Sequence, residues 1–284
     1  MTYRFIEHHR GQYPVIRMCQ VLGVSSSGYY AWRNRKPSQQ ARENQRLRVH
    51  IRAIHKQSKG TYGSPRIHAE LRAQGIQCSR GRVARLMKLE GLKGHRRTRF
   101  KVTTQSNHRL PIAPNLLARR FVAQQPNEKW LADITYIDTR RGWLYLAAIM
   151  DVFSRRIVGW SMSKRIQSTL VEDALLMALR QRQPGDRLLH HSDQGIQYAG
   201  TKYQALLETH GMVCSMSRVS DPYDNAMMES FFASLKSEWV PSRYEDRAEA
   251  RRSLFEYIEI WYNRQRRHSA LGYLSPVQFE ALHA

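Results

Sequence analysis

An abrupt change of residue pattern near residue 120 is the feature that most limits how this 284-residue chain can fold. Before it, apolar residues recur at helical spacing. The 26 lysines and arginines there stand against only four glutamates, a net charge of +22. After it, apolar runs of strand length appear, and 20 basic residues are nearly balanced by 19 acidic ones. The pattern therefore predicts a basic all-α part joined to a nearly neutral α/β part.

The first basic region, residues 1–60, is expected to contain a helix-turn-helix. An apolar helix over 15–22 is followed by Gly23, a residue that turns freely, and by Ser25, a typical N-cap for a second helix. A longer amphipathic helix with a basic face follows in the same region. Its apolar positions are Leu47, Ile51 and Ile54.

A second helix-turn-helix is expected over residues 61–93. Ser64 is predicted to cap its first helix, with Pro65 at the first helical position, and Ser79 is predicted to cap the second. The outward face of that second helix carries the expected DNA contacts Arg80, Arg82 and Arg85. A charge of this size favours a polyanionic partner, most often nucleic acid, over the alternative of small helical hairpins with solvated basic side chains.

Residues 94–120 are basic, contain two prolines and show little periodicity, so we expect a linker. Residues 121–284 are expected to form the α/β domain, a mixed sheet with flanking helices. The expected strands are 129–138, 143–154, 157–163, 187–193 and 212–217. The expected helices are 170–179, a short one near 205–207, 225–239 and 247–262.

Three carboxylates stand in unusual places within this α/β part. Asp133 interrupts an apolar strand, Asp193 ends another strand, and Glu229 lies in the first turns of a helix. Taken singly, each has an ordinary explanation: a hydrogen-bonded buried aspartate, a turn residue and a solvated helix face. Taken together, they offer the oxygen ligands that a pair of hard divalent cations needs, namely two Mg²⁺ or Mn²⁺ ions.

The helix that carries Glu229 has a second informative face. Asn225, Glu229 and Lys236 share it, about a quarter turn from an apolar stripe. The stripe can pack on the sheet while Glu229 points along the sheet surface. Two divalent ions there could activate a water or a 3′-hydroxyl and stabilise the leaving oxygen of a phosphodiester. The stripe consists of Met228, Phe232, Leu235 and Trp239.

Cysteine usage and hydropathy bear on the cell compartment. Cys19, Cys78 and Cys214 are odd in number and far apart, which favours neither a disulfide framework nor a zinc site. The longest apolar stretch, residues 144–150, is far too short to span a bilayer. We therefore expect a cytoplasmic protein without a membrane partner.

The sequence resembles the B-frame transposases of the insertion sequence three family, relatives of retroviral integrases with a ribonuclease-H-like core. The resemblance extends over essentially the whole chain, including the two helix-turn-helix segments. The residues that carry it are Trp130, Asp133, Thr135, Tyr136, His191, Ser192, Asp193, Gly195, Tyr198, Tyr223, Asp224, Asn225, Ala226, Glu229, Ser230, Phe231, Phe232, Leu235, Lys236, Tyr262, Asn263, Arg266, His268, Ser269, Leu271, Gly272 and Tyr273.

The resemblance implies roles for particular residues. Asp133, Asp193 and Glu229 would be the metal-binding catalytic acids of a DDE transposase, and Lys236 would contact the terminal DNA of the mobile element. Asn225 and Arg266 are further expected DNA contacts. For the segment around Arg266, a helix that packs Trp261 inward with solvated arginines is an equally good interpretation.

The resemblance also implies a biological setting. Family members cut and join DNA at the ends of the element, so the expected partners are element ends and target DNA, bound by a homo-oligomer near the bacterial nucleoid. An upstream-frame partner or fusion is a further expectation. Two alternatives stay open: a DNA-binding regulator with a silent catalytic core, and a nuclease of the ribonuclease H type.

Overall fold

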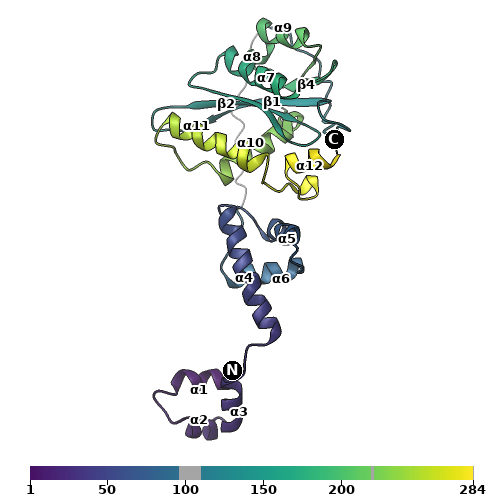
Figure 1. Cartoon of the computed structure of the whole chain (residues 1–284). Helices are drawn as coiled ribbons and strands as arrows, with labels where there is room; N and C mark the ends of the chain where they lie inside the picture. Colours follow the sequence, from purple (N-terminus) through teal and green to yellow (C-terminus); the bar gives the residue numbers. More distant parts are fainter. Residues whose placement is uncertain (96–109, 219–220, 284) are drawn as a thin grey trace.

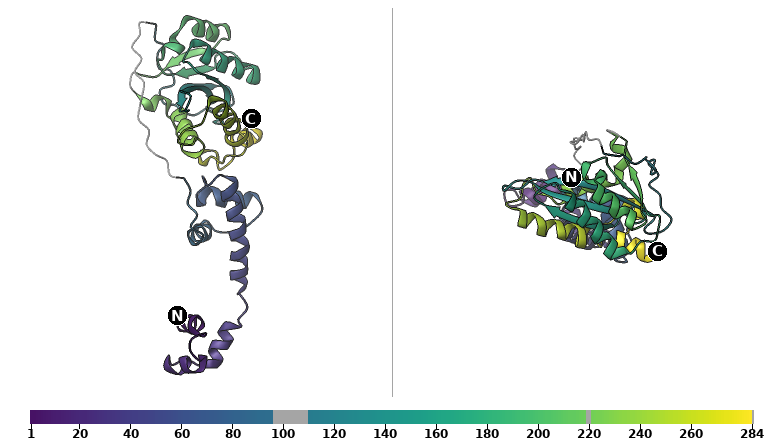
Figure 2. Two further views of the ribbon diagram at one scale, coloured as in Figure 1. Left: turned by 90° about the vertical axis from the view of Figure 1, so that its left-hand side faces the viewer. Right: turned by 90° about the horizontal axis from the view of Figure 1, so that it is seen from above.

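The chain forms an elongated molecule in which three units follow one another (Figure 1). The structure is a computed structural model and describes residues 1–95, 110–218 and 221–283. The α/β domain lies at one end, helices α4–α6 lie next to it, and helices α1–α3 lie at the other end. The left view in Figure 2, turned by 90° from that of Figure 1, shows the same order along the long axis.

The N-terminal unit is a three-helix bundle of α1 (Thr2–His9), α2 (Val15–Val21) and α3 (Ser26–Arg33). The predicted turn is confirmed: Gly23 has a φ of +63°, and the Ser25 hydroxyl accepts a 2.9 Å hydrogen bond from the Gly28 N–H. Helix α1 was not predicted from the sequence. The small core of this unit consists of Ile6, Met18, Cys19 and Tyr29.

The second unit contains α4 (Gln39–Gln57), α5 (Ser64–Ala73) and α6 (Arg80–Leu89). The predicted cap at Ser79 is confirmed by a 3.2 Å bond from the Arg82 N–H. The predicted cap at Ser64 is wrong, because the helix begins there and Gly63 is its N-cap. Helix α4 packs on α5 and α6, which favours a domain boundary between α3 and α4 over the proposed one at residue 60.

The α/β domain is built on a five-stranded sheet with the strand order β3-β2-β1-β4-β5. The first three strands form antiparallel hairpins, whereas β4 pairs parallel with both β1 and β5. Its strands are β1 (Lys129–Ile137), β2 (Leu144–Asp151), β3 (Ile157–Ser163), β4 (Leu189–Ser192) and β5 (Val213–Met216). All five predicted strands are present, with ends shifted by at most a few residues.

Helices cover both faces of this sheet (Figure 1). One face packs against α7 (Ser168–Arg182), α8 (Ile196–Ala199) and α9 (Thr201–Thr209), with their own apolar core. The other face packs against α10 (Ala226–Glu238) and α11 (Arg247–Phe255). The predicted class, a mixed α/β sheet with flanking helices behind an all-α region, is therefore confirmed.

The C-terminal part departs from the single helix predicted over 247–262. Helix α11 ends at Phe255 and continues as a π-helix over Glu256–Tyr262. Within this π-helix, the side chains of Tyr257, Ile258, Trp261 and Tyr262 are buried. Two short segments, η3 (Ser269–Leu271) and α12 (Pro276–His283), complete the chain.

The predicted linker divides into two parts. Residues 96–109 lie outside the described residues. Residues 110–120 lie against the α/β domain: Leu117 is buried, and the N–H groups of Leu116 and Leu117 donate to the Ser215 hydroxyl at 2.9 and 3.2 Å. Within the described ranges, none of the helices has the length and apolar character that crossing a membrane requires.

The second unit packs on the C-terminal segments of the α/β domain. The rings of Tyr62 and Trp261 lie 5.5 Å apart, and the Lys59 ammonium lies 3.3 Å from the centre of the Trp239 ring. Arg66 pairs with Glu238, the last residue of α10, at 3.3 Å. The helix that carries Glu229 is therefore linked directly to the second helical unit.

Close packing of α7 on β3 depends on a glycine and leads to a stability prediction. A Cβ at Gly159 would lie 2.2 Å from the Ala174 carbonyl oxygen and 2.7 Å from the Ala178 Cβ, both in α7. Because helix backbone cannot move away cheaply, we expect Gly159→Ala to lower the free energy of unfolding by about 1–3 kcal/mol. Urea denaturation of the variant and the wild type measures this difference in the free energy of unfolding. A Cβ at Gly185 would have no atom within 4 Å, so the control Gly185→Ala should change the free energy of unfolding by about 1 kcal/mol at most. Equal effects of the two variants would contradict the packing argument.

Candidate active site

The strand register brings two of the predicted acids together. In the parallel β1–β4 pair, Leu131 lies opposite His191. Strand β4 ends at Ser192 and Asp193 is the next residue, so the same register continued by two residues makes Asp133 and Asp193 neighbours on one face of the sheet. This face is the one that α10 covers.

Backbone N–H groups hold both carboxylates in place. The Asp133 Oδ1 accepts a 2.7 Å bond from the Ile134 N–H, and the Asp193 Oδ1 accepts a 2.9 Å bond from the Gly195 N–H. A side chain at position 195 would crowd this second contact, because its Cβ would lie 2.9 Å from the same Asp193 oxygen. The turn after β4 therefore fixes the direction of the Asp193 side chain.

Glu229 approaches the pair from α10. It lies in the first turn of that helix with an exposed side chain, while Met228, Phe232 and Leu235 of the predicted stripe are buried. The predicted arrangement of this helix is thus observed: the stripe packs on the sheet, and Glu229 stays at its edge.

Electrostatics indicate that the three acids share one environment. Burial raises the pKa of the Asp133 carboxyl well above its ordinary value, and the charges of Asp193 and Glu229 raise this pKa further. Within residues 1–95, 110–218 and 221–283, no three His, Cys, Asp or Glu side chains lie close enough together to hold a metal ion. Carboxylate oxygens are ligands that suit a hard cation, and the Glu229 side chain is exposed.

Lys236 lies beside the acids. Its ammonium is 4.4 Å from the centre of the Tyr136 ring, and its charge acts against the rise in the pKa of Asp133. Burial lowers the pKa of Lys236, while the negative charge of Asp133 opposes this change. The lysine is therefore half-buried at the edge of the site rather than fully solvated.

The two histidines before Asp193 have different roles. His190 is buried on the α9 side of the sheet, 2.9 Å from the Tyr203 hydroxyl, and burial lowers its pKa to about 3. The His191 ring contacts the Ser215 and Ser217 hydroxyls at 2.8 and 3.1 Å, and burial lowers its pKa to about 4. Both are therefore neutral near pH 7, and His191 links β4 to β5 next to the site.

Two of the expected DNA contacts have partners inside the protein. Asn225 is 7% exposed, and its Nδ2 donates to the Ala132 carbonyl at 3.1 Å. Arg266 is 2% exposed, and its Nε and Nη2 donate to the two carboxylate oxygens of Glu238, each at 2.6 Å. Their burial argues against direct contact with DNA, so we do not include these residues among the proposed DNA contacts.

The outward face of α6 is more open. Arg80 and Arg85 are exposed. Arg82 is partly engaged, since its Nε donates to the Asn44 side chain at 2.8 Å and its guanidinium pairs with Glu43 at 3.3 Å. Helix α6 thus presents a basic surface away from its apolar core.

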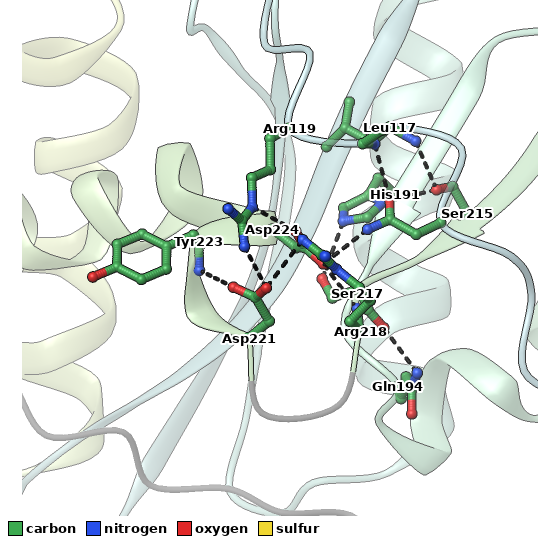
Figure 3. A network of polar contacts seen from close by, with 12 residues as sticks. Leu117, Arg119, His191, Gln194, Ser215, Ser217, Arg218, Asp221, Tyr223 and Asp224 are labelled. Atoms are coloured by element: carbon green, nitrogen blue, oxygen red, sulfur yellow. Dashed lines mark hydrogen bonds and ion pairs between the residues drawn. The ribbon is translucent and has the colours of Figure 1, made fainter.

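Sequence reasoning did not identify Asp224 as part of the site. Its carboxylate is fully buried two residues before α10 and accepts hydrogen bonds from Arg218 and Arg119 (Figure 3). It also accepts one from the Asn115 side chain. The available signal was its place in a motif that includes Asn225 and Glu229. Its partner Arg119, however, stands more than a hundred residues earlier in the chain.

Comparison with protein families agrees with this architecture. Two family profiles described as "Integrase core domain" match residues 123–222 and 210–276, and one described as "HTH-like domain" matches residues 42–100. The fold and these matches define a DNA-binding polynucleotidyl transferase of the transposase and integrase class.

Individual relatives narrow the class further. The chain is 43% identical to "Transposase InsF for insertion sequence IS3A" of Escherichia coli K12, over 99% of this chain and 98% of the relative. It is 47% identical to the "Insertion element IS600 uncharacterized 31 kDa protein" of Shigella sonnei, over 92% and 97%. The chain therefore belongs to the insertion sequence 3 family of transposases and functions in DNA transposition, as the sequence motifs predicted.

Similarity to solved structures is weaker. The HTLV-2 integrase catalytic core domain in complex with magnesium has 16% identity and a TM-score of 0.41, covering 55% of this chain and 97% of that chain. Similarity at this level does not transfer ligands or partners.

Proposed function

We propose that the protein catalyses metal-dependent cleavage and strand transfer at the ends of its insertion sequence, with Asp133, Asp193 and Glu229 as the metal ligands and catalytic acids. The observation that supports this most strongly is the β1–β4 register, because its continuation by two residues past the Leu131–His191 pair would bring Asp133 next to Asp193. The influence of Glu229 on the Asp133 pKa adds the third acid to the same environment.

The proposed cofactors are two divalent ions, Mg²⁺ or Mn²⁺. When bound, such ions would lower the pKa of a water or 3′-hydroxyl and neutralise charge on the leaving oxygen. The protein itself would contribute by positioning the three carboxylates. Backbone N–H groups orient Asp133 and Asp193, and α10 presents Glu229 at the sheet edge. Lys236 would contact a phosphate of the element end, because its ammonium lies beside the acids.

DNA is proposed to contact α6 as well as the α/β domain. The exposed Arg80 and Arg85 and the partly engaged Arg82 form the basic face of that helix. We further propose that element ends and target DNA are bound by a homo-oligomer, and that an upstream-frame partner or fusion contributes to the assembly. The relatives named for insertion elements support the choice of the element's own ends as substrate.

Incubation of the purified full chain with a labelled duplex that carries its element's terminus tests this function. Mg²⁺ or Mn²⁺ should yield a nick at the end and then joined product, whereas a chelator should abolish both. An RNA–DNA hybrid of unrelated sequence should not be cut. Cleavage of that hybrid without any preference for the terminus would favour the nuclease alternative instead.

The α6 surface leads to a prediction about salt. Arg85→Ala should weaken DNA binding similarly for all sequences and make the slope of log K against log [salt] less negative by about 0.9, because one phosphate contact is lost. Fluorescence anisotropy between 50 and 200 mM salt measures this slope. Arg251→Ala, an equal charge change at an exposed position of α11, is the control. Equal slopes for Arg85→Ala and the wild type would remove α6 from the DNA interface.

A further inference from the structure

A buried acidic residue outside the proposed metal site joins three parts of the chain that surround it. The Asp224 Oδ1 accepts bonds from Arg218 Nη2 at 2.9 Å and Arg119 Nε at 3.0 Å. The Oδ2 accepts from the Arg218 N–H and Nε at 2.9 and 3.0 Å, and from the Asn115 amide at 2.8 Å. Figure 3 shows the two arginines meeting at this carboxylate.

The partners of Asp224 come from segments far apart in sequence. Asn115 and Arg119 lie in the segment that precedes β1, and Arg218 follows β5. Asp224 itself lies in η1 (Pro222–Asn225), the short helix that leads into α10. The start of α10 is therefore held against both segments through one carboxylate.

This carboxylate is also next to the proposed acids. The following residue, Asn225, donates to the carbonyl of Ala132, the residue before Asp133. On the other side, Ser217 precedes Arg218, and its carbonyl accepts a 2.8 Å bond from the Gln194 amide, directly after Asp193. The Asp224 contacts thus lie between the strands that carry the two aspartates and the helix that carries Glu229.

The arginines at this position are neutralised within the protein. Arg119 and Arg218 each pair with both Asp221 and Asp224, so two positive and two negative charges meet here. The hydrogen bonds from Arg218 hold the pKa of Asp224 well below its usual range, with burial acting against them. An ionised carboxylate in a buried position is stable only with such partners, and losing them is costly.

We propose that Asp224 is a positioning residue for Glu229: through Arg119, Arg218 and Asn115 it fixes the start of α10, and so sets the distance of Glu229 from Asp133 and Asp193. This inference rests on the proposed role of Glu229 as a metal ligand. Glu229 lies three residues after Ala226, the first residue of α10, about 4.5 Å along the helix, so a shift or tilt of the helix start is passed on to it. Residues that orient metal ligands typically change metal affinity by about 10–100-fold when mutated.

Asp224→Asn in the full chain tests the proposal, because it keeps the size of the side chain and removes its charge. We expect its Mn²⁺ affinity, measured by calorimetry without DNA, to fall about 10–100-fold, and the Mg²⁺ concentration for half-maximal cleavage to rise by a similar factor. Hydrogen exchange should show weaker protection of the amides in the first turn of α10. DNA affinity should stay within about twofold of the wild type.

Two further variants make the outcome decisive. Arg119→Gln, at a half-exposed side chain, should shift Mn²⁺ affinity in the same direction by a smaller factor, and it carries the test if Asp224→Asn does not fold. The loss of Mn²⁺ affinity in the double variant Asp224→Asn/Arg119→Gln should be smaller than the product of the two single losses, because both substitutions break the same contact. Asp186→Asn, the same substitution at an exposed loop position before β4, should change Mn²⁺ affinity less than threefold.

Unchanged metal binding in these variants would contradict the proposal. Wild-type Mn²⁺ affinity and Mg²⁺ dependence in Asp224→Asn or Arg119→Gln, with only a lowered melting temperature, would show a purely structural role and overturn the proposal. Failure of the proposed function would look different, because Asp193→Asn would then cleave DNA as the wild type does.

Discussion

Asp193→Asn is expected to lower the rate of cleavage at the element end by at least about 10³-fold, a loss of about 4 kcal/mol of transition-state stabilisation. The asparagine keeps the shape of the side chain and its bond from the Gly195 N–H, but removes the negative charge that a divalent ion needs. DNA binding should persist, because the basic surface lies elsewhere. Single-turnover cleavage of a labelled end, with anisotropy for binding, measures both quantities.

A matched change outside the site provides the control for this variant. Asp186→Asn makes the same chemical substitution at an exposed loop position before β4 and should leave cleavage within about twofold. Equal cleavage by the wild type and Asp193→Asn would refute the assignment of the acids. DNA binding without metal-dependent product from the wild type itself would instead favour the silent regulator.

Arg266→Ala is expected to lower the free energy of unfolding by about 3–5 kcal/mol. Arg266 and Glu238 form a paired, two-bond contact with both side chains less than 10% exposed. Removing the arginine leaves a buried carboxylate with only the longer contact to Arg66. Because Arg66 belongs to α5, the link between the second unit and α10 should weaken as well. Guanidinium unfolding followed by tryptophan fluorescence measures the change.

The stability effect of Arg266→Ala has a matched control and a defined pH dependence. Arg264→Ala, at an exposed position of the same segment, should change stability by about 0.5 kcal/mol or less. Burial tends to raise the pKa of Glu238, but the hydrogen bonds and charges of Arg266 and Arg66 together outweigh this effect and lower the pKa. The pair therefore stabilises the fold above the ordinary glutamate pKa, and this contribution is lost as the pH falls through the lowered pKa. A wild-type-like stability of Arg266→Ala at neutral pH would contradict the account.

Local patterns were sufficient to predict most of the fold. The strands and the stripe of α10 follow from periodicity, which burial on one or both faces imposes directly on neighbouring residues. Asp133 stood out because a carboxylate in an apolar strand needs a reason to be there. The parallel β1–β4 register, whose continuation brings Asp133 next to Asp193, followed from the fold and not from any spacing in the sequence.

Contacts between distant segments could not be predicted in this way. Arg266 looked like a surface arginine in a basic segment, and its burial depends on Glu238, which only the tertiary fold brings near. Asp224 and Arg119 meet for the same reason. Helix α4 shows the general point, because its apolar face was predicted correctly while its packing partners were not.

The charge asymmetry acquires a more specific meaning in the structure. Some of the basic residues are paired with acidic ones inside the protein, as in the pairs Arg119–Asp224 and Arg267–Glu70. Other basic residues, such as Arg80 and Arg85, face solvent on α6. The basic surface available to DNA is therefore smaller than the count of 46 lysines and arginines suggests.

If carboxylates of this chain bind the metal that cleaves DNA, replacing the Asp133 carboxylate by a thiolate tests this most directly. Carboxylates suit Mg²⁺, whereas a thiolate favours softer metals. Cleavage of the labelled element end by Asp133→Cys should therefore be lost in Mg²⁺ and partly restored when Mn²⁺ replaces it, with the wild type active in both. Wild-type cleavage by Asp133→Cys in Mg²⁺ would contradict the account, because Asp133 would then not be a metal ligand.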